Sequence, residues 1–268
     1  MTLHPLTLPE NEVHLWRANL DALRSEQTRL LDLLSPDERY RAASFHFACD
    51  RERYVVARGF LRTLISQYLA CLPSEISFRY STSGKPELDG ALTSSHLQFN
   101  LSHSSHMAVF ALTRGRKVGV DIEHIRADFD TLAVAQRFFS AAEKEALLSV
   151  SPERQAQAFF NCWTRKEAFV KGTGKGLAFP LDQFDVSVFP GQATELLATR
   201  PDPEERRHWS IWALDITPGF AGALVVEGSG VILQAELDLQ VRGNEFPLTA
   251  QALATLDRAL DRHHSNAS

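Results

Sequence analysis

The sequence predicts an α+β protein in which two similar α/β lobes face each other across a cleft. Three features recur in each half of the chain: a strand pattern, a helix that opens with Ser-x-x-Glu, and a long helix that carries cationic residues. The two helix openings are Ser35–Glu38 and Ser140–Glu143. We place the boundary at Gly115, which gives an N-terminal lobe over residues 1–114 and a C-terminal lobe over residues 115–268.

Local patterns define the elements of the N-terminal lobe. Val13 and Leu15 alternate with His14 and Trp16, which is typical of a strand. Pro36 follows Ser35, which is typical of a helix start. The expected elements are a strand at 12–20, helices at 21–34, from 35 and at 50–70, a strand at 76–80, a turn at 81–86, an irregular loop at 87–96, and strands at 97–102 and 107–112.

The C-terminal lobe restarts with a strand and contains a long helix that begins at Ser151-Pro152-Glu153. The expected elements are a strand at 118–125, helices at 131–138, at 141–150 and from 152 to the glycines at 172–176, strands at 184–189, 209–216 and 220–227, and a loop at 191–208. From about residue 228 an extension follows, with a strand pattern at 231–239 and a polar helix pattern around 249–262, and the sequence suggests no role for it.

Composition excludes several classes of protein. A net charge of −5 argues against a general nucleic-acid binder, so any anionic ligand needs a local basic patch. Cys49, Cys71 and Cys162 include no C-x-x-C pair and predict neither a disulfide framework nor a thiolate metal site. The first residues lack the basic and apolar regions of a signal peptide, and no apolar run approaches the ~20 residues that span a bilayer. We therefore expect a soluble, cytoplasmic protein.

Two carboxylates lie on one face of the strand at 118–125. Period-two alternation places Asp121 and Glu123 together, about 6–7 Å apart along the strand, while Val120 and Ile122 point into the core. A hard divalent ion such as Mg²⁺ would relieve their repulsion, because it takes one or two carboxylates together with substrate phosphates. An edge strand with a solvated acidic face is the alternative for an isolated D-x-E.

Glu167 and Lys171 stand four residues apart on the long helix of the C-terminal lobe, on the stripe that begins with Phe160 and Trp163. A surface Glu–Lys pair at this spacing contributes only about 0.2–0.5 kcal/mol. An apolar stripe that turns into Glu and Lys just before a glycine-rich exit is unusual for a core helix. These two residues are therefore candidates for chemistry.

Basic residues in the N-terminal lobe could bind an anion. Guanidinium groups match phosphate oxygens in a bidentate manner, although a solvated face of mixed charge would explain part of the cluster. His103, at a strand end, suits a phosphate or ribose better than zinc, because no thiolates accompany it. The glycines at 172–176 follow a helix instead of preceding one, so they do not form a P-loop. The six arginines are Arg39, Arg41, Arg51, Arg53, Arg58 and Arg62.

Five blocks occur together and in order: GKP at 84–86, FNLSHS at 99–104, GVDIE at 119–123, RFFS at 137–140 with Glu143, and WTRKEAFVK at 163–171 followed by GKGL at 174–177. From about residue 13 to residue 227 the chain closely resembles the 4′-phosphopantetheinyl transferases of the surfactin-synthetase-activating type. The resemblance implies a pseudo-dimeric monomer that holds coenzyme A between its lobes. It implies transfer of phosphopantetheine to a serine of an acyl or peptidyl carrier protein, with release of adenosine 3′,5′-bisphosphate.

The resemblance also assigns roles to residues. Asp121, Glu123 and Glu167 match Mg²⁺ ligands, and Glu167 also matches the general base that activates the carrier serine. Lys171 matches a lysine that contacts the phosphates and helps the leaving group. Four further matches concern the coenzyme A nucleotide and phosphates: Lys85, Ser102, His103 and Arg41.

Two positions depart from the pattern. Glu38 stands where relatives have a second lysine that contacts the cofactor, and Arg53 or Arg39 could compensate. Tyr54 replaces a small hydroxyl residue.

Two other functions stay open: a catalytically silent module that binds carrier proteins, and a Mg²⁺-dependent hydrolase of nucleotide diphosphates. The carrier is expected to dock near residues 140–180.

Overall fold

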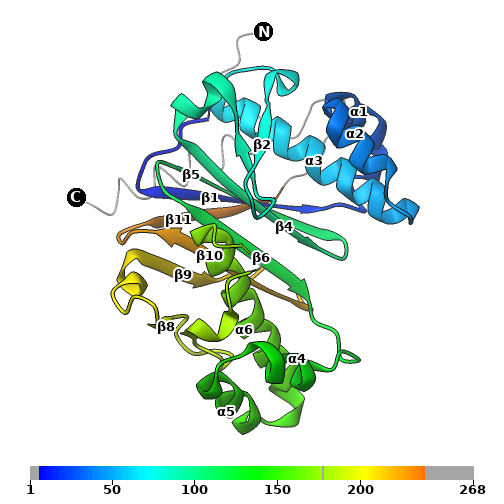
Figure 1. Ribbon diagram of the computed structural model, residues 1–268. Helices are drawn as coiled ribbons and strands as arrows, with labels where there is room; N and C mark the ends of the chain where they lie inside the picture. The colour runs from blue at the N-terminus through cyan, green and yellow to red at the C-terminus, as the bar shows by residue number, and fades with distance from the viewer. Residues whose placement is uncertain (1–5, 177, 239–268) are drawn as a thin grey trace, which may run out of the picture.

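The computed structural model describes residues 6–176 and 178–238 and shows two β-sheets stacked between helices (Figure 1). Successive side chains along a strand point to opposite faces, so both faces of each sheet receive buried apolar side chains. The first sheet has the order β11 (Ile232–Asp238), β1 (Glu12–Asn19), β5 (Met107–Arg114) and β4 (Leu97–Ser104). The second sheet has the order β6 (Val118–His124), β10 (Phe220–Glu227) and β9 (Trp209–Ala213).

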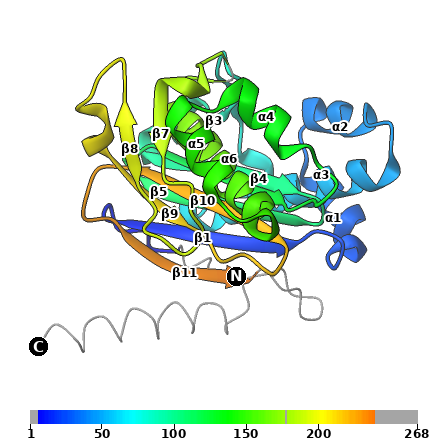
Figure 2. The same ribbon diagram turned by 90° about the horizontal axis from the view of Figure 1, so that it is seen from below.

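Helices cover the outer face of each sheet (Figures 1 and 2). Trp16 of β1 and Phe110 of β5 pack in one core with the helix α3 (Ala48–Leu69), next to which lie α1 (Gln27–Leu33) and α2 (Pro36–Ala43). The other outer core joins β10 to α6 (Pro152–Thr173), with α4 (Thr131–Phe138) and α5 (Ala141–Ser149) beside it. Among the described residues no helix is both long and apolar enough to cross a membrane.

A third core joins the two sheets face to face. Val13 and Leu15 of β1 meet Val120 and Ile122 of β6 and Leu224 of β10, and all five are buried. The predicted alternation in β6 is therefore confirmed, because Val120 and Ile122 face the first sheet. The acids between them must face the other way, toward α6.

The helix boundaries follow the expected signals. In α5, the Ser140 amide donates to the Glu143 carboxylate (2.9 Å) as part of a capping box. The helix α6 begins at Pro152 and ends at Thr173, and its C-cap Gly174 has a φ of +72°, which is left-handed and favours glycine. The helix predicted at 21–34 is shorter than expected, since a 3₁₀ turn (Arg24–Glu26) precedes α1.

Two predicted loops contain strands. Residues 87–96 were expected to be irregular, but β3 (Pro86–Leu88) pairs with β2 (Phe78–Tyr80), and a 3₁₀ helix follows at Gly90–Ser95. The expected loop at 191–208 contains β8 (Leu196–Thr199), which pairs with β7 (Phe184–Val186), and a 3₁₀ helix at Glu205–His208. Strands of three or four residues are too short to show a clear period-two pattern, so the local sequence does not indicate them.

The strand of the extension forms at Ile232–Asp238 and pairs in parallel with β1. The chain thus passes from the second sheet back to the edge of the first (Figure 1). The helix expected around 249–262 lies outside the described residues.

Candidate active site

The candidate site lies where β4, β6 and α6 meet. Gly119 permits this meeting, because a Cβ atom there would overlap the carbonyl oxygen of Ala168 and the amide nitrogen of Gly172. Both are backbone atoms of α6, so neither can move aside easily. The glycine therefore lets α6 lie directly on β6, and this contact brings the Glu167–Lys171 stretch beside the two acids of β6.

Asp121 is the centre of the polar contacts. Its side chain is almost fully buried, and Oδ1 accepts hydrogen bonds from Lys171 Nζ (2.7 Å) and from Ser102 Oγ (2.9 Å). The other oxygen, Oδ2, is buried and has no hydrogen-bond partner among the described residues. A buried carboxylate oxygen without a partner is costly, so a cationic ligand at this position would be favourable.

The negative charge of Asp121 acts on both Glu123 and Glu167. Burial raises the pKa of Glu123, Asp121 raises it further, and the hydrogen bond from Ser104 opposes both. Burial also raises the pKa of Glu167, and the charges of Asp121 and Glu123 add to this effect. Three carboxylates that repel one another suit a hard divalent cation.

The three acids fit Mg²⁺ as a set of donors, although they are not yet arranged around a common metal position. Within the part of the chain that the structure describes, no three His, Cys, Asp or Glu side chains already stand in metal-holding geometry. Instead the ammonium of Lys171 neutralises Asp121. The fit rests on the orphaned Oδ2 and on the mutual repulsion of the carboxylates.

Basic side chains gather beside the acids, around His103. Desolvation lowers the pKa of His103, and the positive charges of Lys171, Arg53 and Arg41 lower it further. The structure therefore brings these four predicted residues into one neighbourhood. Arg53 already binds Asp21 through two hydrogen bonds of 2.8 Å, whereas exposed Arg41 lies 5.7 Å from the centre of the Tyr54 ring.

Lys85 ties three segments together beside the site. Its Nζ donates to the carbonyl oxygens of Val118 (2.9 Å) and Lys171 (3.0 Å), and burial lowers its pKa to about 8. It also lines a cavity of about 260 Å³ that reaches Glu167. Side chains and backbone from the turn, β4 and α6 form the walls, among them Gly84, Lys85, Asn100, Leu101, Glu167 and Lys171.

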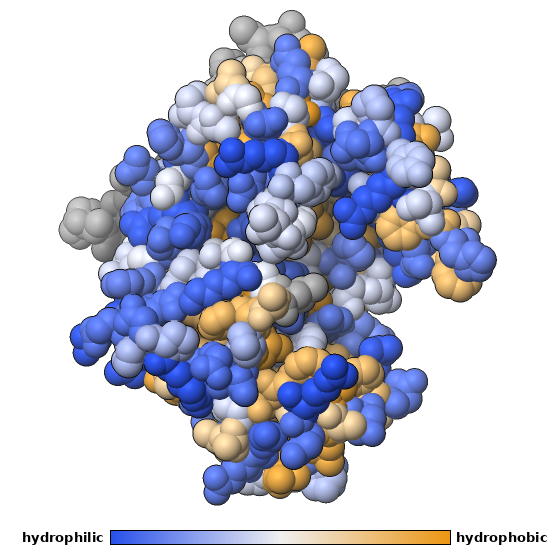
Figure 3. Space-filling view, viewed as in Figure 1, coloured by the Kyte–Doolittle hydropathy of each residue, from blue (hydrophilic) through white to orange (hydrophobic). Residues whose placement is uncertain are grey.

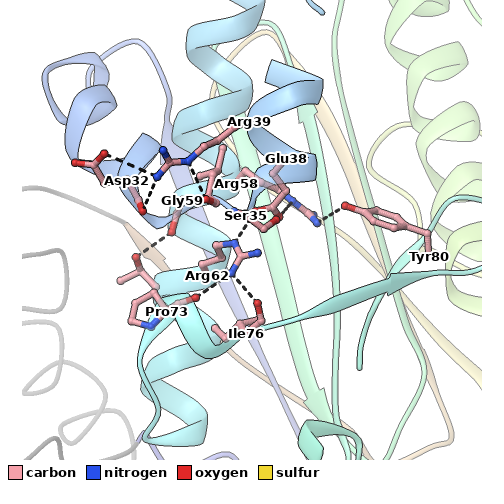
Figure 4. A network of polar contacts seen from close by, with 12 residues as sticks. Asp32, Ser35, Glu38, Arg39, Arg58, Gly59, Arg62, Pro73, Ile76 and Tyr80 are labelled. Atoms are coloured by element: carbon pink, nitrogen blue, oxygen red, sulfur yellow. Dashed lines mark hydrogen bonds and ion pairs between the residues drawn. The ribbon is translucent and has the colours of Figure 1, made fainter. Parts of the chain in front are cut away.

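Part of the predicted arginine cluster has a structural role instead. Glu38 is buried and accepts hydrogen bonds from Arg58 (2.7 Å) and Arg62 (2.6 Å), as Figure 4 shows. Those two arginines are therefore not available to an anion, and the prediction was wrong for them. Arg39 binds the Leu34 carbonyl and pairs with Asp32, which does not favour it as a replacement for the lysine of relatives.

Sequence reasoning missed the contribution of Asn100, Ser104 and Gly119 to the geometry of the site. Ser104 Oγ donates to Glu123 Oε2 at 2.8 Å, and Asn100 Oδ1 accepts from the Val120 amide at 2.8 Å. The signal was present in the sequence, since Asn100, Ser102 and Ser104 recur at period two and so share one face of β4. Ser102, which the resemblance assigns to the nucleotide, directs its hydroxyl to Asp121.

Both halves of the chain match known protein families. Residues 117–225 match the family described as 4′-phosphopantetheinyl transferase superfamily, and residues 16–114 match the family described as 4′-phosphopantetheinyl transferase, N-terminal.

Curated relatives cover most of the chain. The 4′-phosphopantetheinyl transferase HetI of Nostoc sp. is 38% identical over 225 residues, which are 84% of this chain and 92% of HetI. The transferase Sfp of Bacillus subtilis is 31% identical over 202 residues, which are 75% of this chain and 85% of Sfp. A solved structure, the Thermotoga maritima holo-[acyl-carrier-protein] synthase, aligns with 42% of this chain and 62% of its own at 23% identity and a TM-score of 0.34, a likeness too slight to support an argument.

Proposed function

This chain belongs to the 4′-phosphopantetheinyl transferase superfamily, and we propose that it transfers the phosphopantetheine group of coenzyme A to a serine of an acyl or peptidyl carrier protein. The observation that carries the proposal is the meeting of three carboxylates and one lysine where α6 lies on β6. Those four residues are Asp121, Glu123, Glu167 and Lys171.

The proposed reaction exchanges one bond to phosphorus for another. The serine oxygen bonds to the phosphorus that carries pantetheine, the pyrophosphate bond breaks, and adenosine 3′,5′-bisphosphate leaves. Glu167 takes the serine proton, directly or through water. Its raised pKa suits this task, because a general base works best when its pKa approaches the working pH. Lys171 donates to a phosphate oxygen and so stabilises the charge that develops there.

We assign Mg²⁺ to Asp121, Glu123 and Glu167. When bound, the ion would neutralise the pyrophosphate oxygens. The support is the buried, unpartnered Oδ2 of Asp121 and the raised pKa of both glutamates, which burial causes and the charge of Asp121 increases. Lys171 would then exchange its contact with Asp121 for a phosphate oxygen.

The basic neighbourhood around His103 would hold the nucleotide end of coenzyme A. Arg41 is exposed and has no ion pair among the described contacts, so of these cations it is the most available to bind a phosphate. Arg53 would have to share its guanidinium with Asp21. Lys85 would contribute from the edge of the cavity, and Ser102 would act through Asp121 more than by direct contact.

We also propose that the chain works as a pseudo-dimeric monomer in the cytoplasm, with lobes at 1–114 and 115–268 and the active site between them. The repeated order of strand, capped helix and long helix supports this arrangement. The carrier would dock near residues 140–180. Figure 3 shows apolar side chains gathered over α4 and α6, and the large apolar residues Leu132 and Leu148 are exposed on α4 and α5.

Intact-mass measurement of an apo carrier protein tests the proposal. The carrier is incubated with this protein, coenzyme A and Mg²⁺, and we expect a gain of one phosphopantetheine that EDTA prevents. No gain across acyl and peptidyl carriers, with coenzyme A still bound, would support the silent binding module instead. Breakdown of coenzyme A without any carrier would support the hydrolase.

A further inference from the structure

Strands β4 and β6 lie at the edges of the two sheets and are joined through side chains of β4. Three amides of β6 donate to three β4 side-chain oxygens, always twenty residues earlier in the sequence. The pairs are Val120 with Asn100 (2.8 Å), Ile122 with Ser102 (3.3 Å) and His124 with Ser104 (3.1 Å). We call the three β4 residues Asn100, Ser102 and Ser104 the side-chain seam.

Two members of the seam also hold the acids. Ser102 Oγ accepts from the Ile122 amide and donates to Asp121, and Ser104 Oγ accepts from the His124 amide and donates to Glu123. A hydroxyl has one donor and two acceptor positions, so each serine can make both bonds at once. Each serine therefore fixes a carboxylate relative to the backbone amide that follows it.

The two acids are not held equally. Asp121 Oδ1 receives Lys171 as well as Ser102, so the loss of one serine leaves a partner. For Glu123, the hydrogen bond that the structure describes comes from Ser104 at 2.8 Å. Glu123 is also less buried than Asp121 and has more freedom to turn away. The orientation of Glu123 thus depends on Ser104 to a greater extent than that of Asp121 depends on Ser102.

We propose that Ser104 is a positioning residue that orients the Glu123 carboxylate toward the cation. This inference rests on the proposed function for the role of Glu123 as a metal ligand. Side chains that hydrogen-bond to metal ligands typically contribute 10–100-fold to metal affinity. Thr113 of β5 provides the contrast, because its buried hydroxyl donates to the Arg116 carbonyl oxygen (2.6 Å) and holds no carboxylate.

Mn²⁺ binding in the presence of saturating coenzyme A, followed by the electron paramagnetic resonance of free Mn²⁺, tests the inference without any turnover. We expect Ser104→Ala to weaken Mn²⁺ affinity about 10–100-fold. Ser104→Thr keeps the hydroxyl and should restore the affinity to within a few-fold of wild type. Thr113→Val should lower the melting temperature, as loss of a buried hydrogen bond does, and leave Mn²⁺ affinity unchanged.

Equal Mn²⁺ affinity in Ser104→Ala and wild type would overturn the inference, as would failure of the threonine to rescue. An equal loss in Thr113→Val would show that the loss of any buried hydrogen bond disturbs the site, and would overturn the inference too. The carrier-mass measurement decides the transferase function separately. A protein that shows the expected Mn²⁺ affinities and yet modifies no carrier would refute the proposed reaction and not the role of Ser104.

Discussion

At the scale of single residues, Lys171 decides how the acids of β6 are neutralised. Its ammonium lies 2.7 Å from Asp121 Oδ1, and its side chain is 30% exposed, so it can leave without disrupting the core. In this state it competes with a divalent ion for the same carboxylate. Binding of an anionic substrate that attracts Lys171 should therefore assist cation binding, and the reverse must hold equally.

Lys171→Met should raise the affinity for Mg²⁺ in the absence of coenzyme A by roughly tenfold or more, because a cation within 4 Å of the carboxylate is removed. Isothermal titration with Mg²⁺ measures this directly. Lys85→Met is the matched control, since it also removes a lysine charge but Lys85 contacts only backbone carbonyls in the described contacts. The competition is refuted if both variants change equally or neither changes.

Lys85 should make stability depend on pH. Burial lowers its folded pKa from 10.5 to about 8, so between these values the unfolded chain binds a proton that the folded chain does not. Unfolding free energy therefore rises as pH increases from about 8 toward 10.5, and the gain is lost as pH falls through 8. Urea denaturation across this pH range should show that the unfolding free energy of wild type, minus that of Lys85→Met, rises with pH. A difference that is flat with pH would contradict this explanation.

At the scale of elements, the contact between β6 and α6 depends on the absence of a side chain at Gly119. The atoms that a Cβ would overlap belong to the backbone of α6. Relief would require α6 to move away from β6, and that movement would separate Lys171 from Asp121.

Gly119→Ala should therefore lower the free energy of unfolding by at least about 2 kcal/mol and reduce transfer activity. Gly172→Ala is the matched control on the facing element. Its Cβ would meet the Gly119 amide nitrogen, the Trp209 ring and Val225 at 3.4–3.5 Å, which is ordinary contact. Alanine is also favoured over glycine inside a helix by about 1 kcal/mol, so this variant should be at least as stable as wild type. Equal destabilisation of the two variants would refute the role of Gly119.

Local signals predicted the elements whose causes are local. The capping box at Ser140, the proline at the start of α6 and the period-two pattern of β6 all placed their elements correctly. The same patterns could not show that Glu38 is buried between Arg58 and Arg62, because the two arginines come from α3. For the candidate site, the sequence indicated the acids and lysines, but not that the hydroxyls of β4 face them.

At the scale of the whole molecule, each sheet covers the inner face of the other. The core between the sheets takes residues from β1 and β5 on one side and from β6 and β10 on the other. The first sheet also takes its edge strand, β11, from the end of the described chain. We therefore expect each half of the chain to depend on the other for its stability.

We expect calorimetry of the full chain to show one cooperative unfolding transition, with equal calorimetric and van't Hoff enthalpies. Residues 1–114 expressed alone should show no such transition, because they lack both β11 and the second sheet. Two resolved transitions in the full chain, or a cooperative transition of the fragment, would show that the first sheet is an independent domain.

The transfer rate of Glu167→Gln, measured by the intact mass of the carrier at saturating coenzyme A and Mg²⁺, tests the central claim most directly. The amide keeps the shape of the side chain but cannot take a proton, so the rate should fall about 100–10,000-fold. Coenzyme A affinity should stay within a few-fold of wild type, because Glu167 is assigned no contact with the nucleotide. A variant that transfers phosphopantetheine at the wild-type rate would remove Glu167 from the mechanism and contradict the assignment of this site.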